Sequence, residues 1–218
     1  MHYLSDVEER QRRKPSGATW KVTLLKIFLL CAGSVAILLP AWLPNRPGRP
    51  LERGTVELLQ AGLLAAATAV MIGALAHSGS RRSVCRVMAL GLAAALVGEL
   101  EDFFSGVMKW PFPDAWIIGI LLGAAVLTVL KHKKVMLRFI ETAGHHAGAG
   151  FIGAALLIIY VFNRVVGAPQ FWRASLGDAF RPEIPIICKS YLELLACYFI
   201  FVGSVGLAIT LGRREELD

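Results

Sequence analysis

Residues 186–211 have the sequence IICKSYLELLACYFIFVGSVGLAITL, in which the only charged side chains are Lys189 and Glu193. A helix needs about 20 mostly apolar residues to cross the hydrocarbon core of a bilayer. This stretch is longer than that requirement. It therefore predicts a transmembrane helix, and one that carries two charged groups within the membrane.

Further apolar blocks of similar length precede this stretch, at 22–42, 56–77, 84–103, 115–130 and 147–167. The composition agrees, because 56% of the 218 residues are hydrophobic and 18% are charged, against about 45–50% and about 25% in soluble domains. In lipid, a helix satisfies all of its own backbone hydrogen bonds. The sequence thus predicts an all-α polytopic membrane protein, a single bundle of about six transmembrane helices with short loops. A basic arm (1–21) precedes this domain (22–211), and a short tail (212–218) follows it.

Basic residues are spread unevenly over the predicted loops. With both termini in the cytoplasm, fourteen Lys and Arg residues lie in cytoplasmic segments and six in outer loops. The positive-inside rule predicts this bias. We therefore expect both termini to be cytoplasmic in a multi-pass protein of a bacterial inner membrane. Membrane lipids then account for the net charge of +7, and no nucleic-acid partner is predicted.

Cysteine and histidine give little support for a cofactor. The four cysteines fall inside or at the ends of predicted spans, and no two form a CxxC pair. Histidines could bind a metal or a haem, and four of them fall at the predicted cytoplasmic ends of spans: His77, His132, His145 and His146. None lies deep within a helix, so a polar rim is the simpler interpretation. We predict no metal and no cofactor, although these histidines keep the question open.

Ionisable and amide side chains occur at membrane depth on four of the predicted spans. A charge near the bilayer centre costs at least about 2.5–3.5 kcal/mol, so such residues need a partner or water. On the predicted topology the candidates all lie in the outer half of the bilayer: Glu57, Gln60, Glu99, Asp102, Arg164 and Glu193. Together they predict a polar pocket, open to the outer side, in which carboxylates bind a cation or a proton.

The same residues also have purely structural interpretations. Glu193 lies four residues after Lys189 on one helix face, so these two side chains could pair. Arg164 could instead neutralise Glu193 or extend to the headgroups. Asp102 could lie among the headgroups, and Glu57 could complement a helix dipole. The sequence leaves the partner of Glu193 open between Lys189 and Arg164.

Small residues at four-residue spacing predict where helices pack closely, because they let two backbones approach in lipid. Gly119 and Gly123 form such a pair in 115–130, and the spacing recurs near the start of 147–167 in two further pairs, Gly144 with Gly148 and Ala149 with Gly153. A longer stripe follows 56–77: Ala61, Ala65, Ala69 and Gly73.

Three classes of function fit these features. The leading expectation is ion- or proton-coupled transport of a small solute through the outer polar pocket. The second is a non-catalytic subunit or assembly factor of a larger membrane complex, or a homo-oligomer, since the apolar spans leave no room for a soluble domain. The third is a lipid-modifying enzyme in which paired carboxylates act as acid and base. HExxH, GxSxG and phosphate-loop motifs are absent, so no catalytic residue is predicted.

Overall fold

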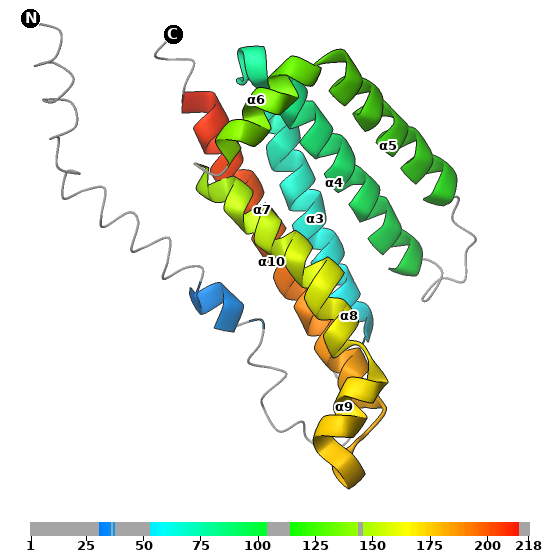
Figure 1. Cartoon of the computed structure of the whole chain (residues 1–218). Coiled ribbons are helices and arrows are strands. Elements are labelled where there is room, and N and C mark those ends of the chain that lie inside the picture. Colours follow the sequence, from blue (N-terminus) through cyan, green and yellow to red (C-terminus); the bar gives the residue numbers. More distant parts are fainter. Residues whose placement is uncertain (1–30, 36, 38–52, 104–113, 144–145, 214–218) are drawn as a thin grey trace, which may run out of the picture. The chain divides into compact units, whose positions relative to one another are not determined.

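The computed structural model describes residues 31–35, 37, 53–103, 114–143 and 146–213 (Figure 1). These residues form helices and short turns, without a strand among them. Within this part of the chain, five helices are long and apolar enough to cross a membrane. The protein is therefore an all-α, multi-pass membrane protein, as the sequence predicts.

The first predicted span, 22–42, lies mostly outside the described residues. Residues 31–35 and 37 of this span are helical, and they belong to a unit, residues 1–42, that is separate from residues 43–218. The described bundle thus has five candidate spans where the sequence predicts about six in all.

The first two helices of the bundle form a tight hairpin. α3 (Arg53–Leu75) and α4 (Arg82–Phe103) are joined by a short 3₁₀ turn, η1 (Gly79–Arg81). Gly79 has a φ of 35°, in the left-handed region where a residue without Cβ is unstrained. The Arg82 Nε donates to the Leu75 carbonyl at 2.9 Å, which satisfies one of the carbonyls left open at the end of α3.

The next two helices lie against this hairpin. α5 (Asp114–Lys131) packs along α4. Its terminal residues Asp114 and Lys131 have the charges that complement a helix dipole. α6 (Lys133–Ala143) is a short amphipathic helix that contacts the ends of α4 and α5.

One further span is interrupted by a wider turn. It consists of α7 (Ala147–Leu157), a π-helical turn, η3 (Ile158–Phe162), and α8 (Asn163–Val166). Two short elements follow, α9 (Pro169–Leu176) and η4 (Gly177–Ala179). Pro169 stands at the start of α9, where its missing N–H costs nothing.

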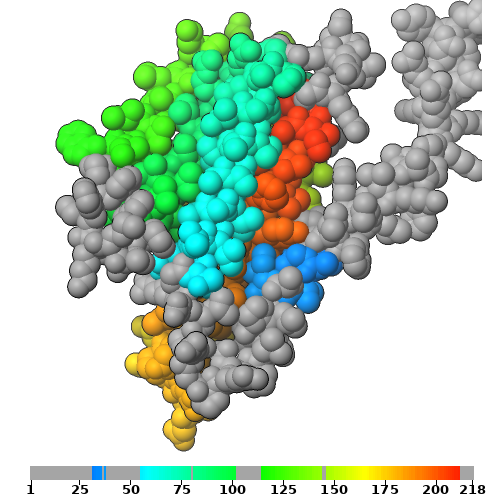
Figure 2. All heavy atoms as spheres, turned by 180° about the vertical axis from the view of Figure 1, so that it is seen from behind, coloured from blue at the N-terminus to red at the C-terminus, as the bar shows by residue number. Residues whose placement is uncertain are grey.

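The last helix, α10 (Glu183–Arg213), is the longest and lies between α3 and α7 (Figure 1). In residues 43–218 the helices follow one another side by side in the order α5, α4, α3, α10, α7. The opposite view shows α3 and α10 as neighbours along their length (Figure 2). The core that α3, α4, α7 and α10 share consists mainly of small and medium apolar residues, including Leu64, Ala67, Met71, Cys85, Ala89, Ala155, Ala196, Cys197 and Ile200.

The small-residue stripe predicted on α3 is not its packing face. Ala65, Ala69 and Gly73 are exposed, whereas Leu64, Met71 and their neighbours face the core. Steps of four residues drift about 40° around a helix with 3.6 residues per turn. The stripe therefore leaves the face of α3 that packs against α4 and α10 after one turn, and among the described residues only Ala61 of the stripe is buried.

Of the predicted pair Gly144 and Gly148, Gly148 lies in a close helix contact and Gly144 lies outside the described residues, whereas a Cβ at Gly153 of the second pair would meet no described atom within 4 Å. A Cβ at Gly148 would lie 2.6 Å from the Gly203 carbonyl oxygen and 2.7 Å from the Leu207 amide nitrogen. A Cβ at Gly203 would lie 2.7 Å from the Gly148 carbonyl oxygen. α7 and α10 thus cross backbone against backbone. By contrast, a Cβ at Gly119 or Gly123 would meet no atom of the described chain within 4 Å.

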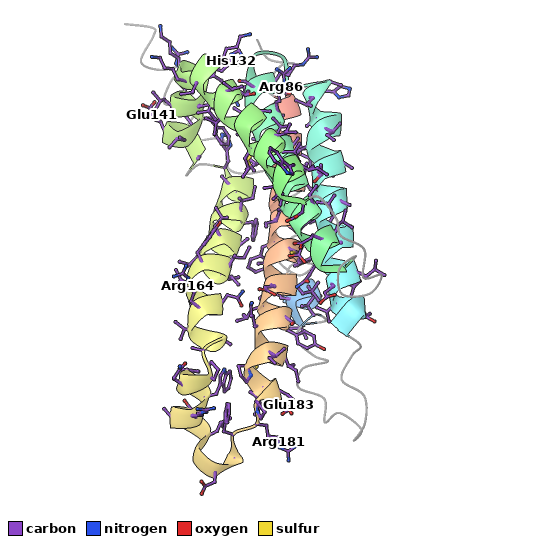
Figure 3. All side chains as sticks on the ribbon, turned by 90° about the vertical axis from the view of Figure 1, so that its right-hand side faces the viewer. Arg86, His132, Glu141, Arg164, Arg181 and Glu183 are labelled. Carbon is purple, nitrogen blue, oxygen red and sulfur yellow. The ribbon has the colours of Figure 1, made fainter. Side chains whose placement is uncertain are left out.

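Charged side chains gather at the two ends of the bundle. Arg86, His132 and Glu141 mark one end, and Arg181 and Glu183 mark the other (Figure 3). The end with Arg86 has the basic residues that the sequence assigns to the cytoplasm, and the opposite end holds the site described next.

Candidate functional site

A cavity of about 430 Å³ lies where α3 begins, α4 ends and α10 begins. Its polar lining comes from these three helices: Glu57, Gln60, Glu99, Lys189, Ser190 and Glu193. Gly167 and three prolines of the α8–α9 and η4–α10 segments complete one wall. Four of the six predicted site residues, Glu57, Gln60, Glu99 and Glu193, therefore face one space.

The other two predicted residues lie elsewhere. Arg164 lines a neighbouring cavity of about 320 Å³, together with Asn163, Lys189 and Glu193. It is exposed and lies on the flank of α8 turned away from α10 (Figure 3). Asp102 belongs to α4, but its side chain lies outside the described part of the structure.

Gln60 fixes α3 to α10 at the cavity wall. Its side chain is buried, and Nε2 donates to the Ser190 carbonyl at 3.2 Å. The Ser190 hydroxyl donates in turn to the Ile186 carbonyl one helical turn earlier, at 3.1 Å. A buried amide that found no partner would cost about 1–3 kcal/mol. The bond therefore holds the two helices in one register beside the cavity.

Glu193 has two partners, both at the same oxygen. Its Oε1 accepts a hydrogen bond from Asn163 Nδ2 at 2.7 Å and lies 3.7 Å from Lys189 Nζ. Of the two ion-pair partners left open by the sequence, the structure thus has Lys189. The amide of Asn163, on the facing helix, is a second partner that was not predicted.

The π turn explains how Asn163 comes to face α10. Ala155 is fully buried in the core that α7 shares with α10. Eight residues of regular helix would turn Asn163 about 80° away from Ala155. A π turn takes up one extra residue, which removes about one 100° step and brings Asn163 to within about 20° of Ala155. The wide turn η3 thus places the amide opposite Glu193.

The Asn163 amide presents its NH₂ group to the Glu193 carboxylate. An ionised carboxylate only accepts hydrogen bonds, so it requires the NH₂ group of the amide to face it. The side chain is 8% exposed, and its Oδ1 has no hydrogen-bond partner among the described residues. A buried acceptor left in this state is rare and calls for a physical explanation.

Among the described residues, the lining of the larger cavity has more acidic than basic side chains. Three carboxylates, those of Glu57, Glu99 and Glu193, line the cavity with a single ammonium group, that of Lys189. Carboxylate oxygens only accept hydrogen bonds when ionised, so they are groups to which a positively charged ligand can bind.

The arrangement is a cavity and not a closed metal centre. Among the described side chains, no group of three His, Cys, Asp or Glu residues is placed to hold a metal ion. Of the four histidines considered above, His145 lies outside the described residues, and His146 is buried beside the ring of Phe139.

Comparison with other proteins adds no functional assignment. No family model, curated protein or solved structure matches this chain. The features that bear on function are therefore the cavity, the three carboxylates in its described lining and the contacts of Glu193.

Proposed function

We propose that the protein binds a small, cation-bearing solute in the cavity between α3, α4 and α10, and that it transports this solute across the membrane coupled to protons or other cations. The observation that carries the proposal is the cavity of about 430 Å³ with Glu57, Glu99 and Glu193 in its lining.

The size of the cavity favours an organic solute over a bare ion. Sites for small molecules typically measure about 300–1,000 Å³ and combine apolar walls with a few polar groups. Here Val56, Ile186 and the prolines supply apolar wall, and the carboxylates supply the groups that attract a cation. A methylated or primary amine has both characters, so amines are the substrate class that this lining suits best.

Coupling follows from the same carboxylates. When a cationic solute leaves, a proton or another cation can take its place at the carboxylates that bound it. Solute and proton then compete for one set of groups. This competition is the physical basis of exchange transport, and it gives Glu99 and Glu193 a direct role as binding residues.

The proposed orientation follows the distribution of basic residues. Arg86 and the other basic side chains at the end of the bundle with α6 would face the cytoplasm. The cavity would then lie in the outer half of the bilayer of a bacterial inner membrane. Reporter fusions after Arg213 and within α9 should report opposite sides, and a C-terminus outside the cell would contradict this orientation.

The binding proposal can be tested on the purified, full-length protein in detergent. Methylammonium, tetramethylammonium and guanidinium, as chloride salts, should raise the melting temperature in a saturable way and by more than the same concentration of sodium chloride. Glu99→Gln and Glu193→Gln should each weaken binding of the best probe about tenfold or more, equivalent to at least about 1.4 kcal/mol. Glu141→Gln is the matched control, because Glu141 is exposed on α6 at the opposite end (Figure 3).

The transport step needs a separate measurement. Proteoliposomes should take up labelled methylammonium faster than empty vesicles, and an imposed pH gradient should change the rate. Loss of this flux in Glu193→Gln but not in Glu141→Gln would support the proposal. Saturable binding without flux would leave a cation-binding protein and refute transport.

One observation favours a second candidate, a non-catalytic subunit of a larger complex. Among its described residues α5 buries only Ala125, and its GxxxG face at Gly119 and Gly123 is open. Such faces suit another transmembrane helix. A stoichiometric partner that co-purifies in mild detergent with the wild-type protein but not with Gly119→Leu, together with no flux, would favour this candidate over transport.

A further inference from the structure

The two cavities beside α10 share three lining residues. Gly167, Lys189 and Glu193 border both the space of about 430 Å³ and the space of about 320 Å³. Residues common to two adjoining cavities form the partition between them. Two of these three carry opposite charges, and they lie one helical turn apart on α10.

The stem of Lys189 lies against Gly167. A Cβ at Gly167 would come within 3.6 Å of the Lys189 Cδ, so the lysine passes beside a residue without a side chain. Its ammonium group lies 3.7 Å from Glu193 Oε1, which is longer than a good charged hydrogen bond. The side chain is also 54% exposed. Lys189 is therefore held in place weakly and can leave at low cost.

Glu193 is better fixed than its ionic partner. Asn163 donates to Oε1 at 2.7 Å from the facing helix. Among the described residues, neither the hydrogen bond nor the ion pair of Glu193 uses Oε2. The carboxylate is thus oriented by Asn163, and Glu193 and the weakly held Lys189 both line the two cavities.

We infer that Lys189 is a built-in substitute for the solute: its ammonium occupies the cation position at Glu193 in the empty protein, and an incoming cationic solute displaces it. This inference rests on the proposed cation-binding function and specifies how that site is regulated. Displacement would also open the partition between the two cavities, because Lys189 is one of the three residues that form it. Asn163 would hold the carboxylate in place while the cation is exchanged.

The opposite role for Lys189 predicts the opposite result. A lysine that gripped an anionic group of the solute would strengthen binding, and its removal would weaken affinity. A lysine that competes with the solute lowers affinity, and its removal would strengthen binding. The sign of the change therefore separates the two roles.

The experiment measures binding of tetramethylammonium and methylammonium to the full-length protein by calorimetry. Lys189→Met keeps the length of the side chain and removes its charge, and we expect it to bind about fivefold more tightly than the wild type, the size set by a half-exposed ion pair. Lys189→Arg keeps the charge and should bind no more tightly than the wild type. Lys134→Met is the control, because Lys134 is exposed on α6, away from the cavities. If Lys189→Met does not fold, Lys189→Gln replaces it.

Each outcome has a distinct meaning. Tighter cation binding in Lys189→Met than in the wild type, Lys189→Arg and Lys134→Met supports displacement. Equal binding in Lys189→Met and wild type overturns the displacement role but leaves the cation site intact, and weaker binding overturns it in favour of an anion-gripping lysine. If neither protein binds either cation while both are folded, the proposed function itself is refuted.

Discussion

The two halves of α10 make opposite kinds of contact with the span formed by α7, η3 and α8. In the second half, Gly203 and Gly206 lie directly against Gly148, so close that no Cβ fits at Gly148 or Gly203. In the first half, Lys189 and Glu193 border two cavities, and the helices are joined by one side-chain hydrogen bond to Asn163.

This difference shows how one helix pair can be both rigid and functional. In lipid, close backbone contact supplies much of the association energy, because the apolar effect between helices is absent. The glycine crossing therefore carries the stability of the pair. Because the glycine crossing stabilises the pair, the half of α10 with Glu193 can border cavities and carry charged side chains, as a binding site requires.

The largest effect should come from filling the glycine crossing. We expect Gly148→Ala to lower the free energy of unfolding by about 3 kcal/mol, since the new Cβ meets backbone atoms that cannot move aside. Gly150→Ala, two residues further on, should be neutral or slightly stabilising because its Cβ would meet nothing within 4 Å. Chemical or thermal unfolding in detergent measures both. Equal effects at the two positions would show that α7 and α10 do not cross as described.

A smaller effect is expected at the polar half. Replacing Asn163 by Leu removes a hydrogen bond to a charged group, which is worth about 1.5 kcal/mol. Combined with Glu193→Gln in a double-mutant cycle, most of this loss should appear as coupling between the two positions. Gln170→Leu is the control, an exposed amide on α9. Additive single effects would mean that Asn163 and Glu193 act independently.

The ion pair should contribute less than the amide. Lys189 is 54% exposed, so we expect Lys189→Met to reduce the free energy of unfolding by less than about 1 kcal/mol. Raising the salt concentration should shrink the difference further. A loss of more than about 2 kcal/mol would instead make Lys189 a structural residue, with Lys134→Met as the reference for an exposed lysine.

The smallest effect is expected on α5. Gly119→Leu should leave the melting temperature of the purified chain unchanged, because no described atom lies within 4 Å of an added Cβ. A clear destabilisation would reveal that a second copy of the chain covers this face. Crosslinking of wild type and variant in the same detergent would then identify that contact.

The sequence predicts the helices well and their contacts poorly. The long apolar runs correctly place the helices found as α3, α4, α5, α7–α8 and α10, because crossing lipid requires length and apolarity, both visible in the sequence. The same runs contain so many small residues that spacing alone does not show which of them pack. Hence the predicted close packing is found at Gly148, whereas Ala65 and Ala69 are exposed among the described residues.

Part of the candidate site was also visible in the sequence. Charged residues in an apolar run stand out, and four of the six candidates line one cavity. Asn163 was missed as a partner of Glu193, although it is a polar residue inside an apolar run. A helix of constant pitch turns it away from α10, and only the π turn brings it back. A local change of pitch leaves no clear pattern in the sequence.

The glycine crossing also has a mechanical consequence. Backbone contact at Gly148 is the closest approach of α7 and α10 that the glycines define, so a change in their crossing angle would turn about this point. Asn163 lies 15 residues along the span, at the end of a lever arm of about 20 Å. A rotation of about 5° around this point would move the amide about 2 Å from the carboxylate, enough to break a hydrogen bond. A small angular change at a rigid point would thus be amplified into release or capture at Glu193.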